Sequence, residues 1–201
     1  KTELVDENGD LYQYFRFNNT YNASTALSLE GEKNITGRDF KTGDSFTFEV
    51  EGVTGAPLPS GVTKTSGNKG TISIDPSAGK SEDLIFGDIT FTQKDVADGT
   101  RKEEIKDGKK IYTFTKTFTY KVKELGTDAN GMTYDKSEKT VKITVTDDSH
   151  GNMEAKLSDD SQELQWTNEY RSSMDYGNEA GGLAVTKTLH ERSMKAGGFR
   201  F

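Results

Sequence analysis

The chain has 201 residues, a net charge of −7 at pH 7 and no cysteine. The net negative charge argues against a nucleic-acid partner, and the absence of a polybasic segment argues against binding to an anionic membrane surface. Only 31% of the residues are hydrophobic, but 11 Phe and 8 Tyr argue against disorder and favour a thin core between half-buried strands. No run is apolar enough for a membrane span, and no motif for a cofactor is present. Without cysteine, any covalent reinforcement has to come from chemistry other than disulfides.

Short segments in which apolar and polar residues alternate recur along the chain. The clearest is YTFTKTFTYKVKE at 112–124, where Phe118, Tyr120 and Val122 fall on one face and Thr and Lys on the other. This period of two is typical of a half-buried antiparallel strand. The other predicted strands are 26–35, 45–52, 71–75, 84–92, 139–146, 152–158 and 163–170.

Turn-forming residues separate these segments, as Asp107-Gly108 and Asn130-Gly131 illustrate. The polar segment 93–108 predicts a loop or one helical turn, and the Gly/Ser/Thr/Lys-rich segment 54–70 predicts a surface loop. Many short strands with such spacing predict an all-β antiparallel sandwich with Greek-key connections.

The two ends of the chain echo its interior, which indicates a tandem repeat. FNNTY at 17–21 is similar to WTNEY at 166–170, and the segment that starts at Lys187 is similar to the one that starts at Lys33. We therefore expect a fragment of an array. Its expected parts are the last strand of one repeat (1–23), a complete domain (24–171), a linker (172–182) and the first strand of the next repeat (183–201).

Strand alternation places three polar residues on the apolar faces of their strands. Lys33 alternates with Leu29 and Ile35, Glu124 with Tyr120 and Val122, and Asn168 with Leu164 and Trp166. Period two therefore predicts that all three point into the core beside aromatic residues.

A buried ammonium is costly unless it is paired, neutralised or chemically consumed. Each residue taken alone has an ordinary explanation: Lys33 reaches water, Glu124 faces solvent at a strand end, and Asn168 caps a turn. Lys33 and Glu124 together also suit a buried salt bridge. All three together suit a different reaction, in which the neutral Lys amine attacks the Asn carboxamide. Glu then polarises the carbonyl and shuttles the proton to the departing ammonia, leaving a neutral isopeptide bond.

Three long segments resemble the streptococcal pilin isopeptide linkage domain, a module of Gram-positive pilins and repetitive surface proteins. They are LSLEGEKNITGRDFKTGDSFTFEV (27–50), FTYKVKELGTDANGMTYDKSEKTVKITVTD (118–147) and LQWTNEY (164–170). The resemblance implies an immunoglobulin-like sandwich of the Cna B type. It also implies that Lys33 is the nucleophile, Asn168 the electrophile and Glu124 the promoter of the bond.

By the same resemblance, Asn19 and Lys187 are unpaired half-sites of the neighbouring repeats, and we expect both to stay unlinked. The implied function is a structural stalk module of a cell-wall-anchored surface protein or pilus. Its partners are adjacent repeats, and it performs no catalysis beyond its own cross-linking. An alternative is an adhesin domain that binds a host glycan or matrix protein through 54–70 or 93–110.

Other candidate sites carry little weight in the sequence. The acidic pairs Asp147-Asp148 and Asp159-Asp160 match no calcium-binding loop and favour solvated turns. His150 and His190 lack the spacing of zinc ligands, so we expect no metal site. A hydrolase on a β-sandwich remains a third reading, but nothing in the sequence positions a pair of catalytic carboxylates.

Overall fold

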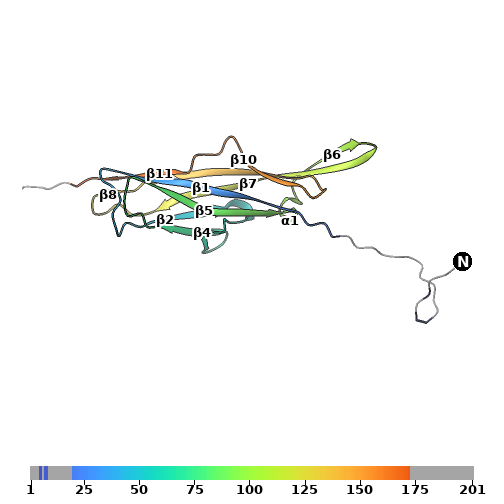
Figure 1. The fold of residues 1–201 in the computed structure, drawn as a ribbon, viewed down its shortest axis with the longest axis horizontal. Coiled ribbons are helices and arrows are strands. Elements are labelled where there is room, and N and C mark those ends of the chain that lie inside the picture. Colours follow the sequence, from blue (N-terminus) through green and yellow to red (C-terminus); the bar gives the residue numbers. More distant parts are fainter. Residues whose placement is uncertain (1–4, 6, 9–19, 173–201) are drawn as a thin grey trace, which may run out of the picture. The chain divides into compact units, whose positions relative to one another are not determined.

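The structure, a computed structural model, describes residues 5, 7–8 and 20–172. Residues 20–172 form an all-β sandwich of two sheets (Figure 1). The first sheet has the order β5 (Ser81–Thr92), β1 (Ser24–Thr36), β11 (Gln165–Tyr170) and β8 (Met132–Thr133). The second has the order β10 (Met153–Leu157), β9 (Glu138–Asp147), β7 (Lys109–Leu125), β2 (Phe46–Gly52), β4 (Lys69–Ile74) and β3 (Thr63–Lys64), with β6 (Thr100–Lys106) paired to β7.

The core lies between the two sheets and is built by the period-two faces of their strands. In β2, the side chains of Phe46, Phe48 and Val50 are buried and alternate with half-buried polar ones. Strand β9 repeats the pattern with Val141, Ile143 and Val145. Because successive side chains of a strand point to opposite faces, each of these segments contributes one apolar face to the sandwich.

The first and last strands of the domain are neighbours, and they run parallel. Residues 32–36 of β1 pair in register with residues 165–169 of β11. The other strand pairs are antiparallel, as the alternation predicted. A parallel pair needs a crossover connection, and here the chain crosses between the two sheets several times between β1 and β11.

The segment 93–108 contains the single helical turn that was one of its two predicted forms, and also a strand that was not predicted. It begins with a single helical turn, α1 (Gln93–Val96), and continues into β6, which forms a hairpin with β7. Asp107 and Gly108 both have positive φ, at 52° and 73°, as a two-residue hairpin turn of type I′ requires. Figure 1 shows this ribbon extending beyond the end of the sandwich.

The segment 54–70 is mostly irregular, as predicted. It contains part of a short 3-10 turn (Val53–Gly55), strand β3 and the first residues of β4. Ala56 and Val96 of these two segments are buried in the apolar core, but neither segment contributes a side chain to the group formed by Lys33, Glu124 and Asn168.

Candidate functional site: a buried lysine, glutamate and asparagine

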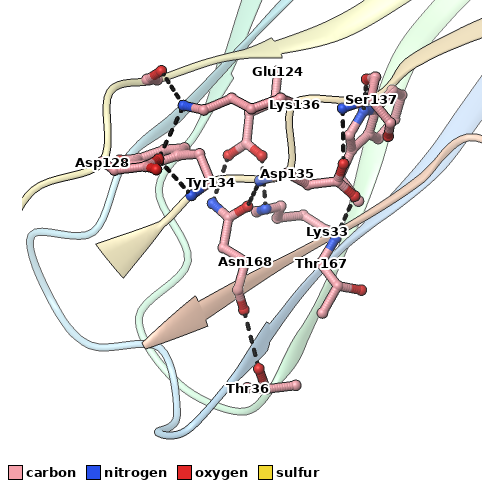
Figure 2. A network of polar contacts seen from close by, with 12 residues as sticks. Lys33, Thr36, Glu124, Asp128, Tyr134, Asp135, Lys136, Ser137, Thr167 and Asn168 are labelled. Atoms are coloured by element: carbon pink, nitrogen blue, oxygen red, sulfur yellow. Dashed lines mark hydrogen bonds and ion pairs between the residues drawn. The ribbon is translucent and has the colours of Figure 1, made fainter. Parts of the chain in front are cut away.

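The three polar residues singled out by alternation meet in the core. Lys33 comes from β1, Asn168 from β11 and Glu124 from β7 of the facing sheet (Figure 2). Lys33 and Asn168 are fully buried, and Glu124 is 6% exposed. Their side chains therefore interact without competition from bulk water.

Strand register brings Lys33 and Asn168 together. In the parallel pair, Lys33 lies opposite Trp166, and Asn168 lies opposite Ile35. Lys33 and Ile35 face the core, and so do Trp166 and Asn168, so the lysine and the asparagine are diagonal neighbours on one face. Glu124, which pairs with Phe48 in the second sheet, reaches them from across the sandwich.

The Glu124 carboxylate bridges the amine and the amide. Lys33 Nζ donates to Oε2 at 2.9 Å, and Asn168 Nδ2 donates to Oε1, also at 2.9 Å. Glu124 thus contacts the nitrogen of the carboxamide, and not the carbonyl group that it was predicted to polarise. That oxygen, Asn168 Oδ1, instead accepts the backbone N–H of Asp135 at 2.8 Å.

Asp135 belongs to the segment between β8 and β9, and the sequence analysis did not select it. Its carboxylate accepts the backbone N–H of Ser137 at 2.9 Å and that of Thr167 at 3.2 Å. The first of these bonds forms a local Asx turn, for which the order Asp-Lys-Ser at 135–137 is a recognisable signal. The second ties the segment to β11 one residue before Asn168.

Aromatic side chains surround the polar group. Lys33 Nζ lies 5.0 Å from the ring centroid of Phe46. Trp166 packs against Phe48 with their centroids 5.1 Å apart, and its indole N–H donates to the Ser137 carbonyl at 3.0 Å. This shell excludes water and strengthens every electrostatic interaction within it.

Burial shifts both ionisable groups toward their neutral forms. It lowers the pKa of Lys33 despite the hydrogen bond and the charge of Glu124, which act in the opposite direction. It likewise raises the pKa of Glu124 against the opposing influence of Lys33 and Asn168. The pair is therefore biased toward a free amine beside a carboxylic acid.

The remaining candidates have structural explanations or lie elsewhere. Asp147 accepts the Tyr21 hydroxyl and the Ser149 N–H, and Asp148 accepts the N–H groups of His150 and Asn152. Asp160 pairs with Lys142. These carboxylates fix turns, and within the described residues no three His, Asp or Glu side chains gather as metal ligands would.

Three predicted features fall on residues outside those that the structure describes: Asn19, Lys187 and His190. The half-site prediction therefore stays a prediction. In the part of the chain from 20 to 172, as in the few described residues before it, no helix is long and apolar enough to cross a bilayer.

Comparison with known proteins identifies a family for most of the chain. The family described as FctA, Spy0128-like isopeptide containing domain, matches residues 29–171. No curated protein matches.

Three solved structures of Streptococcus pyogenes major pilins are similar at low identity. The T-13 pilin is 20% identical with a TM-score of 0.41, over 75% of this chain and 55% of that one. The T3.2 pilin is 18% identical with a TM-score of 0.38 (74% and 54%), and a further major pilin is 16% identical with a TM-score of 0.34 (71% and 50%). The chain thus spans about half the length of these pilins. The family match covers most of the chain and includes all three buried polar residues, so the chain belongs to the Spy0128-like isopeptide-containing domains, as the streptococcal pilin resemblance predicted.

Proposed function

We propose that residues 24–171 form a structural stalk module of a Gram-positive pilus or surface protein, and that the module cross-links itself through an amide bond between Lys33 and Asn168. The observation that carries the proposal is the Glu124 carboxylate, one oxygen of which contacts the amine and the other the amide nitrogen. A buried salt bridge accounts for Lys33 and Glu124, whereas the cross-linking reaction also uses the carboxamide of Asn168, which Glu124 holds through the amide nitrogen.

The proposed reaction balances without a co-reactant. The free amine of Lys33 attacks Asn168 Cγ, forming the new C–N bond, and the bond from Cγ to Nδ2 breaks. Glu124 accepts a proton on the side that faces Lys33 and supplies one on the side that faces Nδ2, which departs as ammonia. The sum is one amine and one primary amide converted into one secondary amide and one ammonia.

The folded structure supplies both the proximity of the reacting groups and the neutral amine that this reaction needs. Holding the amine and the amide together in a fixed geometry contributes roughly 7–11 kcal/mol of the barrier. Burial already favours the neutral amine, which is the nucleophilic form. Phe46, whose ring lies 5.0 Å from Lys33 Nζ, also lines a pocket of about 500 Å³ together with Tyr134.

The position of the bond fits a load-bearing module. In a parallel pair, a pull on the start of β1 and on the end of β11 acts at opposite ends of the two strands. With Lys33 bonded to Asn168, the tension runs along β1 to Lys33, crosses the bond and leaves through β11. The sandwich between these residues carries none of the load, which suits a stalk on a cell surface under shear.

The neighbouring repeats complete the proposal. Residues 1–23 and 183–201 belong to adjacent modules, residues 172–182 are the linker, and other copies of the module are the partners. No feature of 54–70 or 93–110 favours an adhesin, so we propose no host ligand.

Intact-mass spectrometry of the full 201-residue chain under denaturing conditions tests the bond. The wild-type chain is expected to lack the mass of one ammonia, and proteolysis is expected to release a branched peptide that joins Lys33 to Asn168. Lys33→Ala and Glu124→Ala restore the full mass. Lys69→Ala, which removes a lysine paired with Glu49 and Glu51 on the surface, is the matched control and keeps the loss. A wild-type chain of full mass refutes the proposal.

A further inference from the structure

We propose that Asp135 is a positioning residue for this reaction. Its carboxylate holds the segment 134–137 on β11 and thereby aims its own backbone N–H at the carbonyl oxygen of Asn168. The inference rests on the proposed cross-linking and adds a fourth residue to it. Glu124 acts on the nitrogens of Lys33 and Asn168, whereas Asp135 acts on the carbonyl oxygen of Asn168.

The backbone N–H of Asp135 lies where negative charge develops. When the amine attacks, the carbonyl oxygen of Asn168 becomes the oxyanion of a tetrahedral intermediate. The N–H of Asp135 already donates to that oxygen at 2.8 Å, whereas Glu124 contacts the amide nitrogen and the amine (Figure 2). A fixed donor in a dry site stabilises such an oxyanion strongly, because it needs no reorganisation during the reaction.

The Asp135 side chain fixes where that N–H points. Its two oxygens accept separate backbone donors, Ser137 N at 2.9 Å and Thr167 N at 3.2 Å. One bond closes the turn, and the other joins the turn to β11 beside Asn168. Burial opposes ionisation of Asp135, but the hydrogen bonds from Ser137 and Thr167 outweigh it and lower its pKa, so the side chain is a carboxylate with both acceptors available.

A purely electrostatic role for Asp135 predicts a different effect on the rate. Burial is the main cause of the lowered pKa of Lys33, and the negative charge of Asp135 works against it by favouring the ammonium. The same charge adds to the burial that raises the pKa of Glu124. Removing the charge while keeping the shape, as in Asp135→Asn, lowers both pKa values and moves the pH profile of the rate toward lower pH. Charge alone thus predicts a displaced profile with little change in its maximum. Asparagine also leaves one of the two backbone donors facing an NH₂ group, so positioning predicts a lower maximum, and rates are compared at the pH where each is maximal.

The experiment measures the rate of ammonia loss in the full chain. The protein is made by pulse-labelled cell-free synthesis, samples are quenched in denaturant, and the linked fraction is read from the intact mass. Each rate is expressed per folded molecule, with folding followed by near-UV circular dichroism. Asp148→Asn is the matched control, because Asp148 caps the backbone N–H groups of His150 and Asn152 at the end of β9, which pairs with β7 far from Glu124.

We expect Asp135→Asn to slow the reaction on the order of tenfold, and Asp135→Ala on the order of a hundredfold, as misplaced reacting groups do. Replacing the Tyr134–Asp135 peptide bond by an ester, which removes only the N–H, is expected to slow it roughly 100- to 1,000-fold. Asp148→Asn reacts at the wild-type rate.

Wild-type or faster rates in the Asp135 variants and the ester overturn the inference and leave the cross-link intact. A wild-type chain that never loses ammonia overturns both. If Asp135→Ala does not fold, the rate of the Tyr134–Asp135 ester variant tests the inference, because this variant keeps both hydrogen bonds of the Asp135 carboxylate.

Discussion

Replacing Glu124 by glutamine separates two contributions of the site to stability. Glutamine keeps the shape of the side chain but cannot take up a proton or balance the charge of Lys33. We expect Glu124→Gln to block the cross-link and also to leave a buried amine without its acidic partner. The double variant Lys33→Met/Glu124→Gln blocks the cross-link equally but removes the amine, because methionine fills a similar volume and makes a favourable contact with a ring such as Phe46.

The expected magnitudes follow from the structure. The proposed cross-link closes a loop of about 135 residues (168 − 33), and constraining such a loop in the unfolded chain is expected to contribute roughly 5 kcal/mol by the relation used for disulfides. Both variants lose this contribution. Removing one partner of a buried ion pair costs about 3–5 kcal/mol more, and only the single variant bears that cost. The double variant is therefore expected to be more stable than the single one by about 3 kcal/mol, although it carries one more substitution.

Urea denaturation followed by tryptophan fluorescence measures this difference. Trp166 is the only tryptophan of the chain, and it is buried beside the site, so its emission reports unfolding of the domain. Intact mass verifies that neither variant has lost ammonia.

The difference in the free energy of unfolding between the double and the single variant is also expected to depend on pH, and to grow as the pH falls. In the single variant, burial lowers the pKa of Lys33 below its ordinary 10.5, as it does in the wild type, so the folded state binds fewer protons than the unfolded state. Its stability then falls as the pH drops below 10.5, and the gap between the variants widens. Equal stabilities, or a gap that does not change with pH, refute the idea that the buried amine is a cost that Glu124 relieves.

Two further predictions concern the pH dependence of bond formation and the close contact between Gly37 and Tyr170. The rate is expected to have a bell-shaped pH profile in pulse-labelled samples. It rises with pH as Lys33 loses its proton, at a pKa that burial lowers below 10.5, and falls as Glu124 ionises, at a pKa that burial raises above 4.5. Gly37→Ala is expected to lower stability and to slow cross-linking, because Gly37 has φ +84° and an added Cβ meets the Tyr170 carbonyl oxygen. Gly43→Ala, at φ +94° with open space around it, costs only about 1–2 kcal/mol of backbone strain and leaves the rate unchanged, as denaturation and intact-mass time courses can show.

The parts of the site that the sequence predicts are those that depend on local periodicity. Side-chain direction in a strand is fixed by parity, so the apolar neighbours of Lys33, Glu124 and Asn168 suffice to place these residues in the core. Strands with one buried face, such as β2 and β9, are predicted for the same reason. Strand β6 is missed because all of its residues are exposed, so it has no alternation and is defined only by its pairing with β7.

Pairing between distant strands and hydrogen bonds from backbone N–H groups produce no periodic pattern in the sequence. The parallel register of β1 with β11 joins segments more than a hundred residues apart, and nothing in either strand specifies its direction relative to the other. Asp135 contributes a backbone N–H, which every residue except proline has, so no residue type signals it. Its Asx turn is visible in the sequence, but the turn alone does not reveal that it is tied to β11.

The arrangement of the site also determines when the bond can form. Lys33 and Asn168 come from the first and last strands of the domain, and Glu124 comes from the facing sheet. The amine therefore meets the amide only after β1 has paired with β11 and the two sheets have packed. A slip of one residue in β11 turns Asn168 to the outer face and leaves Lys33 without an electrophile. A loosely packed core admits water and lets Lys33 keep its proton. The proposed cross-link is therefore expected to form only in correctly folded molecules. On this proposal it does not direct folding, and instead slows unfolding of a fold that other contacts have already selected.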